Sequence, residues 1–469
     1  LKFEGHRSPV LGTRAAVATS QPLASDVGLR ILRSGGNAVD AAVAIAAALN
    51  VTEPCSTGLG GDCFMLYFEA STRKVHAMNG SGAAPAGLTL ERCKADLSAA
   101  ATATTVAREK PASPPAPAPC PVHIPHPHPH SVTVPGTAAG WVDAVNKFGS
   151  GKLSLSQILE PAVQLADTGF PVSPITAHHW AELRYQLDNG PWGGDLLMPG
   201  GTAPAPGEVF RNPALAGVLR ELGRGGKRAF YEGRIGRAIV EAIQSKGGLM
   251  TMEDLKKHRT TFVEPIVAEF CGVRVHEVPP NGQGITALLA LNMLKHLDVP
   301  GLTPRGGGES TAREEENEVP YLHRLIEVMR LAFADARWYC ADMDKVHVPV
   351  EALLSDSYAK ERAGLFNPSR ASVDVSKGSP PEGSCTVSFQ VVDQAGNAVS
   401  FVNSNYSGFG TGIVPRSCGF SLQSRGANFS LDPSHPNVIA PGKRPYHTII
   451  PCMVTHAESG ELYATLSNM

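Results

Sequence analysis

The alternation of apolar and polar residues that begins at Thr386 places the strongest constraint on the fold. Val387, Phe389 and Val391 point to one side of an extended chain, and the polar residues between them point to the other. The turn-forming stretch DQAGN follows, and AVSFVN then continues the extended pattern. The sequence therefore predicts an antiparallel hairpin, in a chain whose earlier part has mostly helical patterns.

Two helices are predicted near the beginning of the chain. The first, SDVGLRILRSGG, has Ser25 as its candidate N-cap and ends at the glycine pair Gly35–Gly36. Asn37 is the expected cap of the second, NAVDAAVAIAAALN, whose alanine content favours close packing against a neighbouring element. Further along, Thr251 is expected to cap a short helix in TMEDLKKH.

Residues 97–130 interrupt these regular patterns. The segment is rich in alanine and proline and lacks apolar periodicity, so it is predicted to be a flexible insert. Four histidines alternate with proline there: His123, His126, His128 and His130. They could chelate a metal weakly, but a solvated repeat is the favoured interpretation because nothing in the segment fixes a coordination geometry. A second soft insert is predicted at 303–318.

The composition excludes several classes of partner. A net charge of −2 gives no electrostatic basis for binding nucleic acid or an anionic membrane surface. The most apolar run, Ala38–Val51, carries Asp40 and is too short to span a bilayer. The nine cysteines are scattered without CxxC pairs, which argues against a disulfide scaffold or a zinc site. They favour a reducing compartment, so we expect a cytoplasmic location.

The search for catalytic motifs leaves one class of chemistry. The sequence contains no GxSxG elbow, no HExxH motif, no dinucleotide-binding fingerprint and no clear metal cluster. Nucleophilic catalysis by a serine, threonine or cysteine with a nearby base remains open. Thr386 is a candidate, although threonine is common in strands and an ordinary structural role is the simpler interpretation of its position alone.

Several long motifs carry a resemblance to a known family. They are AVATSQPLASDVGLRILRSGGNAVDAAVAIAAALNVTEPCSTGLGGD, GGLMTMEDLKKH, PPNGQG, GNAVSFVNSNYSGFGTGIV and RPYHTIIP. In this order they resemble the γ-glutamyltransferase (glutathione hydrolase) family, from about Pro9 onward apart from the two inserts. The resemblance implies an α+β fold of the N-terminal-nucleophile (Ntn) hydrolase class, which is a four-layer αββα sandwich. It also implies a precursor that cuts itself into two fragments, which stay together as a heterodimer.

On this chain the resemblance places the catalytic threonine at Thr386 and the cut between Cys385 and Thr386. It divides the chain into a large-fragment region, 1–385, and a small-fragment region, 386–469. Cleavage would free an α-amine on Thr386, which titrates near pH ~7.7–8 and can therefore act as base for the hydroxyl of its own residue. The resemblance gives Ser404 a supporting role and implies no metal and no organic cofactor. Cys385 is a rival nucleophile, but nothing nearby in the sequence supplies it with a base.

The expected substrate-binding residues are those at which this sequence departs from the glutathione-cleaving members. The aligned positions are Tyr406, Arg425, Asn428, His447 and Thr448. Asn428 stands where those members carry the acid that holds the substrate ammonium, and Arg425 offers a fork suited to a carboxylate. The motifs SNY and RPYHTIIP look more like the branch that includes cephalosporin-acylase-like members. We therefore expect small amide substrates whose acyl group ends in a carboxylate. The alternative is that Arg425, Asn428 and His447 are ordinary polar wall residues.

Three functions remain open from the sequence. The leading one is an autoprocessed threonine hydrolase or acyltransferase that cleaves γ-glutamyl amides such as glutathione, or related carboxy-acyl amides. Within the enzyme class, the alternative is a glutaryl- or cephalosporin-type acylase with little action on glutathione. A catalytically silent homologue that binds small acids or serves as a scaffold is the alternative of another class.

The resemblance also carries an expectation about the end of the chain. In the family, a glycine pair whose N–H groups form the oxyanion hole follows the strand that ends here near TLSNM. That pair would begin just beyond Met469. We therefore expect the natural polypeptide to continue, and the region 386–469 to be a truncated small fragment.

Overall fold

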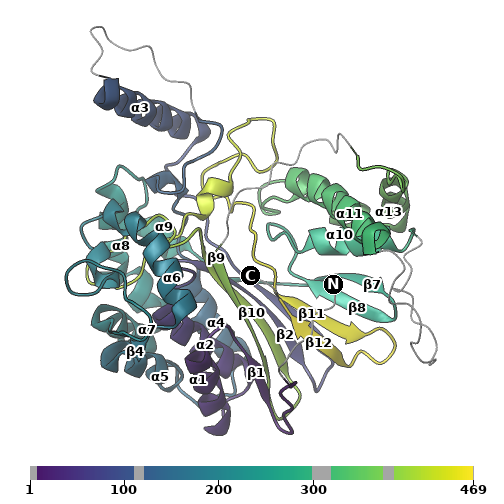
Figure 1. Ribbon diagram of the computed structural model, residues 1–469, viewed down its shortest axis with the longest axis horizontal. Helices are drawn as coiled ribbons and strands as arrows, with labels where there is room; N and C mark the ends of the chain where they lie inside the picture. The colour runs from purple at the N-terminus through teal and green to yellow at the C-terminus, as the bar shows by residue number, and fades with distance from the viewer. Residues whose placement is uncertain (1–7, 110–120, 298–317, 373–384, 468–469) are drawn as a thin grey trace.

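The computed structural model describes residues 8–109, 121–297, 318–372 and 385–467. Two antiparallel sheets form its centre (Figure 1). The strands of the larger sheet are, in spatial order, β1 (Ala16–Ala18), β9 (Cys385–Val392), β10 (Ala398–Tyr406), β2 (Asp62–Glu69), β3 (Lys74–Gly80) and β6 (Thr261–Val263). Those of the smaller sheet are β12 (Leu462–Leu466), β11 (Cys452–His456), β8 (Val273–Glu277) and β7 (Ile266–Phe270). A separate short pair joins β4 (Phe170–Pro171) to β5 (Val209–Phe210).

Helices lie outside both sheets (Figure 1). On the side of the larger sheet are α1 (Pro22–Arg33), α2 (Ala38–Thr52), α4 (Thr137–Phe148), α5 (Leu155–Thr168), α6 (Pro174–Leu183), α7 (Pro213–Tyr231), α8 (Arg234–Gln244) and α9 (Met252–Lys257). On the side of the smaller sheet are α10 (Ile285–Leu294), α11 (Glu318–Tyr339), α12 (Val350–Leu353) and α13 (Asp356–Ala363). The described residues also form short 3₁₀ turns: η1 (Pro129–Ser131), η2 (Arg184–Asn189), η3 (Gly193–Leu196) and η4 (Arg425–Asn428).

Separate apolar clusters fill the spaces between these layers. One cluster lies between the two sheets, and in it Phe64 and Leu66 of β2 pack with Met453 of β11. A second, larger cluster joins the larger sheet to its helices, and a third joins α10 and α11. Because each sheet is covered by helices on one face and by the other sheet on the opposite face, the expected α+β, four-layer αββα architecture is confirmed.

Helix α2 is the central helix of the large-sheet side, and all of its residues are buried. Its alanines allow close packing, and Gly28 of α1 lies so near Ile45 that an added Cβ would come within 2.5 Å of its side chain. Asn37 caps α2 as predicted, because its side chain accepts the backbone N–H groups of Val39 and Asp40. The predicted cap of α1 is wrong: that helix begins at Pro22, a residue type suited to the first helical turn, and not after Ser25.

The predicted hairpin is confirmed as β9 and β10. The two strands pair antiparallel from Ala398 opposite Val392 to Asn403 opposite Val387. Asp393 closes the turn, because its side chain accepts the backbone N–H groups of Ala395 and Asn397. The hairpin occupies the middle of the larger sheet, with β10 paired to β2 on its other edge. Thr386 therefore sits near the start of an inner strand, on the part of β9 that pairs with β10, whereas β1 pairs only with Gln390–Val392.

The segment 97–130, predicted to be a flexible and solvated insert, has a helix and buried side chains among its described residues, although Val122 and His123 are exposed. Helix α3 (Leu90–Glu109) includes the first part of this segment, and residues 121–130 pack against the protein. Leu97 and Ile124 are both buried in one apolar cluster with Phe429. Residues 110–120 lie outside the described residues, as do 303–317 of the second predicted insert. In the described parts of the chain, no helix combines the length and the apolar character needed to cross a membrane.

Candidate active site

A bulge in the hairpin brings Thr386 and Ser404 together. Cys385 is the register partner of Tyr406, and Val387 is the partner of Asn403. Between these two pairs, Thr386 alone faces both Ser404 and Asn405, which is the arrangement of a β-bulge. The bulge turns the Ser404 side chain toward the nucleophile candidate, and the two hydroxyl oxygens lie 3.0 Å apart. Thr386 is only 5% exposed and Ser404 is fully buried.

Two N–H groups contact Ser404 Oγ from the side of β10 and η4. Its Oγ accepts the backbone N–H of Tyr406 at 2.9 Å and an Nη2–H of Arg425 at 3.0 Å. A serine hydroxyl has two acceptor lone pairs and one donor hydrogen. Either hydroxyl can be the donor in the Thr386–Ser404 pair, and the two N–H groups at Ser404 Oγ favour donation by its O–H to Thr386 Oγ1. A donor at this place stabilises negative charge that develops on the threonine oxygen.

Arg425 lies on η4 and is completely buried. Its Nη1 donates to Thr448 Oγ1 at 2.7 Å, and its Cζ lies 4.5 Å from the Tyr406 ring centroid. Its Nε has no hydrogen-bond partner in the described part of the chain. Burial lowers the pKa of Arg425 to about 10, while the charge of Asp62 raises it. The guanidinium therefore stays charged at neutral pH, but both Nη atoms are directed at hydroxyls, so the open carboxylate fork expected from the sequence is not formed here.

Asp62 and His447 form the second polar centre of the site. His447 Nε2 lies 3.2 Å from Asp62 Oδ2, and both side chains are fully buried. The other carboxylate oxygen accepts the N–H groups of Gly82 and Gly136 and the side-chain amide of Gln423, at 3.0, 3.1 and 3.0 Å. Burial lowers the pKa of His447 to about 4, the nearby Arg425 charge acts in the same direction, and Asp62 opposes both. His447 is therefore neutral at pH 7.

The sequence analysis did not identify Asp62 as a site residue. Its only signal was its position directly after a glycine pair in one of the family motifs. A glycine is needed at Gly61 because this residue packs against the backbone of Ser404. A Cβ added to Gly61 would lie 2.2 Å from the Ser404 carbonyl oxygen. The close approach of this turn to β10 is what places Asp62 at the buried centre.

Asn428 and Thr448 lie at the edge of the same cluster. Asn428 Nδ2 donates to the backbone carbonyl of Tyr446 at 3.0 Å, and the Asn428 carbonyl accepts from Asn437 Nδ2 at 2.8 Å. These bonds hold the loop that carries His447 beside η4. The structure thus brings all of the sequence-predicted residues into one region, with Asn428 engaged in holding a loop. Whether any of them binds substrate stays a prediction.

Tyr406 is the strained residue of the site. Its φ of +77° lies in the left-handed region, which a bulky side chain rarely adopts. Holding such a residue there costs roughly 1–3 kcal/mol, so surrounding contacts must fix it. Its ring stacks on His126, with ring centroids 5.2 Å apart and planes inclined by 16°. His126 lies in the segment that its composition predicts to be a solvated repeat, and no local pattern in the sequence indicates its contact with the site.

The other histidines of that segment also have defined neighbours. His130 Nε2 lies 2.8 Å from Asp96 Oδ2, and the rings of His128 and His130 are 4.7 Å apart. In the described parts of the chain, no three His, Cys, Asp or Glu side chains are grouped closely enough to hold a metal ion.

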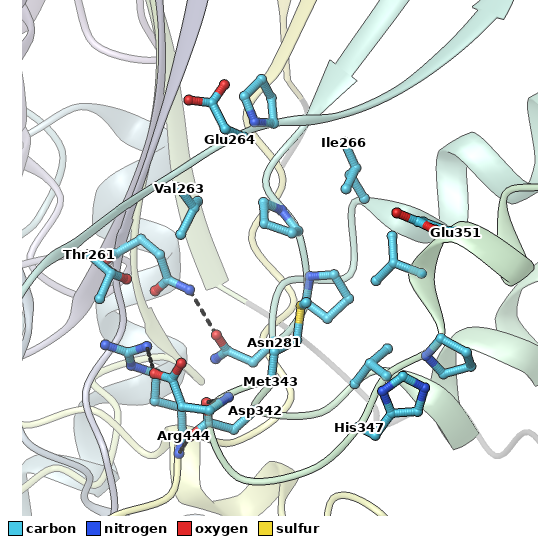
Figure 2. A pocket seen from close by; sticks show the side chains of 18 of the residues that line it. Thr261, Val263, Glu264, Ile266, Asn281, Asp342, Met343, His347, Glu351 and Arg444 are labelled. Atoms are coloured by element: carbon cyan, nitrogen blue, oxygen red, sulfur yellow. Dashed lines mark hydrogen bonds and ion pairs between the residues drawn. The ribbon is translucent and has the colours of Figure 1, made fainter.

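A cavity of about 870 Å³ lies away from the cluster around Thr386 and Ser404. Its lining comes from β6, the turn around Asn281 and the segment 342–352 (Figure 2). The Asn281 carbonyl accepts the backbone N–H of His447 at 2.8 Å, so this turn stands between the cavity and the site. Three residues of its wall are engaged with each other: Arg444 donates to Asp342 through its backbone and to Asp344 through its side chain. Neither Thr386 nor Ser404 lines it, and we assign it no role in the chemistry.

Comparisons with known proteins agree with this architecture. The sequence profile described as Gamma-glutamyltranspeptidase matches residues 24–467. A glutathione hydrolase-like proenzyme, YwrD of Bacillus subtilis (strain 168), is 37% identical over 445 residues, which are 95% of this chain and 77% of the relative. A glutathione hydrolase proenzyme of the same strain is 30% identical over 470 residues, covering 96% and 74%. The crystal structure of a cephalosporin acylase from Bacillus halodurans superposes with a TM-score of 0.78 at 36% identity, covering 99% of this chain and 80% of that one.

Proposed function

The chain belongs to the gamma-glutamyltranspeptidase family, and from this premise we propose that it is a precursor that cuts itself ahead of Thr386 and then acts as a threonine amidohydrolase or acyltransferase. One observation carries the proposal: the Thr386 and Ser404 hydroxyl oxygens lie 3.0 Å apart on an inner strand pair, with Arg425 and a backbone N–H directed at Ser404. This places a hydrogen-bond donor beside a nucleophile candidate in a buried setting.

Self-cleavage is the first reaction. Thr386 Oγ1 attacks the carbonyl carbon of Cys385 and loses its proton, and the Cys385–Thr386 C–N bond breaks as the nitrogen takes up a proton. The product is an ester between the Cys385 carbonyl and Thr386 Oγ1. Water hydrolyses this ester, which leaves a Cys385 carboxylate and restores the Thr386 hydroxyl with a free α-amine. Both fragments remain associated, because β9 is paired on both edges within the larger sheet.

Amide turnover then uses the new N-terminus. The α-amine has an ordinary pKa near ~7.7–8, so a useful neutral fraction exists at neutral pH to accept the hydroxyl proton. Thr386 Oγ1 attacks the substrate carbonyl, the leaving amine departs with a proton, and an acyl-enzyme forms. Water or an acceptor amine releases the acyl group. Protein groups and water supply every proton and bond in this sequence, so the proposal invokes no metal and no organic cofactor.

The proposed substrates are γ-glutamyl amides such as glutathione, or related amides whose acyl group ends in a carboxylate. The cationic Arg425 and the neutral Asn428 favour a carboxylate over an ammonium, because an ammonium that leaves water needs a counter-charge. The one buried carboxylate at the centre, Asp62, is already saturated by His447, Gln423 and two backbone N–H groups. These contacts favour the glutaryl-type alternative, as does the likeness to a cephalosporin acylase.

Two measurements test the proposal. Denaturing gel electrophoresis and intact-mass analysis of the purified protein should detect two fragments, with Thr386 as a new N-terminus, whereas Thr386→Ala should give one uncut chain. Side-by-side turnover of γ-glutamyl-anilide and glutaryl-anilide then separates the two substrate classes. A wild-type protein that stays as a single chain and hydrolyses neither anilide would refute the proposal and favour a silent, small-acid-binding homologue.

A further inference from the structure

A proline- and histidine-rich segment, residues 121–131, forms a strap against the candidate active site. The strap is held at several points: Asn189 Nδ2 donates to the Pro127 carbonyl at 3.0 Å, and His130 pairs with Asp96 on α3. Ser131 Oγ lies 2.7 and 2.8 Å from the carbonyl oxygens of residues 126 and 128. The strap therefore has a defined path, and the position of His126 within it is fixed from both sides.

The end of the strap packs directly on the turn that carries Arg425. Gly426 approaches the Ser131 backbone so closely that an added Cβ would lie 2.8 Å from the Ser131 carbonyl oxygen. Ile124 is buried beside Phe429 in the same apolar cluster. In the mature protein the strap would belong to the large fragment and η4 to the small one, so this contact would join the two fragments at the site.

His126 is the strap residue that reaches the catalytic strands. Its ring lies nearly parallel to that of Tyr406, which is 2% exposed and also carries the Arg425 guanidinium against its ring. Parallel ring stacking and a cation over a ring are both favourable contacts for an aromatic side chain. Together they hold the side chain of a residue whose backbone has the unfavourable φ of +77°.

The backbone of Tyr406 is connected to both reacting groups. Its N–H donates to Ser404 Oγ at 2.9 Å, and Ser404 in turn contacts Thr386 Oγ1. Tyr406 is also the register partner of Cys385, whose carbonyl is the group attacked in self-cleavage. If the Tyr406 ring were released, its backbone could relax out of the left-handed region, and Ser404 would lose one of the two N–H groups that orient its hydroxyl.

We propose that His126 is a positioning residue, which acts through the Tyr406 ring to hold Ser404 and the Cys385–Thr386 bond in their reactive arrangement. The catalytic half of this inference rests on the proposed function. The stack needs a flat ring and not a charge: burial lowers the pKa of His126 and the Arg425 charge lowers it further, so the imidazole is neutral at pH 7.

The test compares His126→Ala with His126→Phe, which keeps a flat ring, and with His123→Ala, an exposed histidine of the same strap. The rate at which precursor disappears is followed by intact mass, and kcat and KM are measured on glutaryl-anilide. We expect His126→Ala to slow self-cleavage and lower kcat about tenfold, which corresponds to the loss of one orienting hydrogen bond, with KM within about twofold. His126→Phe should restore most of both rates, and His123→Ala should match the wild type.

Other outcomes would overturn the inference. If His126→Ala behaves like His123→Ala, the strap does not position the site. A change in KM alone would make His126 a substrate contact and not a positioning residue, and a His126→Phe variant as slow as His126→Ala would show that the imidazole itself acts.

A second measurement does not depend on activity. Hydrogen–deuterium exchange of the Tyr406 amide is compared in the uncut Thr386→Ala chain with and without His126→Ala. Faster exchange in the double variant supports the stack, and equal exchange refutes it. If the wild type neither cuts itself nor hydrolyses amides, the proposed function fails, and the exchange result still decides whether His126 holds Tyr406.

Discussion

The hydroxyl oxygens of Thr386 and Ser404 lie 3.0 Å apart across a bulge in an otherwise regular hairpin. Two N–H groups, one from Tyr406 and one from Arg425, occupy the acceptor positions of Ser404. These contacts favour donation of the serine hydrogen to Thr386 Oγ1, where negative charge would develop in the proposed attack. In the proposed mechanism the same contact would serve both self-cleavage and amide turnover, because both would begin with attack by this oxygen.

Replacing Ser404 should therefore impair both reactions together. Ser404→Ala removes the donor, and we expect roughly a tenfold to hundredfold fall in the rate of precursor cleavage and in kcat. Ser404→Thr keeps a hydroxyl and should retain most of both rates. Mass-resolved cleavage kinetics and steady-state turnover measure the two effects; an alanine variant that cuts and turns over normally would remove Ser404 from the mechanism.

Arg425 is expected to matter for rate more than for stability. It is fully buried, and its nearest polar partners are the hydroxyls of Ser404 and Thr448. Burying a charge is costly, so an apolar side chain of similar length can replace it with little loss of stability. Arg425→Met should lower kcat by roughly tenfold while the thermal midpoint changes by only a few degrees. A large fall in the midpoint with unchanged kcat in the folded fraction would contradict this assignment.

The pH dependence of stability should contain a contribution from His447. Its pKa is lowered to about 4 in the folded protein from an ordinary 6.5, so the unfolded chain binds more protons between these values. Stability from this residue is therefore complete above pH ~6.5 and is lost as the pH falls toward 4. Between pH 7 and pH 5 the wild type should lose about 2 kcal/mol of unfolding free energy through His447.

Urea unfolding at pH 7 and pH 5 measures this effect. His447→Gln keeps a polar group near Asp62 but does not titrate, so its unfolding free energy should fall by about 2 kcal/mol less over the same interval. His258 is also buried with its pKa lowered to about 4 and contributes separately, so the wild type and the variant must be compared at both pH values. Equal losses in the two proteins would show that His447 is not buried neutral.

Substrate preference should respond to a charge at residue 428. Asn428→Asp would supply a counter-charge for a substrate ammonium, and we expect the ratio of kcat/KM for γ-glutamyl-anilide over glutaryl-anilide to rise about tenfold. Asp cannot donate to the Tyr446 carbonyl as Asn428 does, so a modest loss of stability should accompany the change. Asn367→Asp, beyond the end of α13, introduces the same charge elsewhere and serves as the control. An unchanged ratio would contradict the proposed ammonium position.

Local patterns were sufficient for much of the fold. The period-two alternation after Thr386 predicted β9 and β10, and Asn37 and Thr251 were recognised as helix caps that the structure confirms. These features depend on neighbours a few residues away, so they can be read from the chain directly. The cap of α1 was misplaced because Ser25 is a good capping residue by type, whereas Pro22 three residues earlier already starts the helix.

The sequence by itself determined the hairpin that carries Thr386, the alanine-rich helix that packs on it and, through long ordered motifs, the family. Only the tertiary structure decided which groups meet at the site: Asp62 with His447, which are 385 positions apart, and His126 with Tyr406. A buried hydrogen bond and a ring stack depend on where distant segments cross, and no local periodicity encodes that crossing. The strap could not be predicted for the same reason. A Pro- and His-rich composition by itself predicts a solvated segment, and the strap packs only because Tyr406 and the turn at Gly426 form a surface against which it fits.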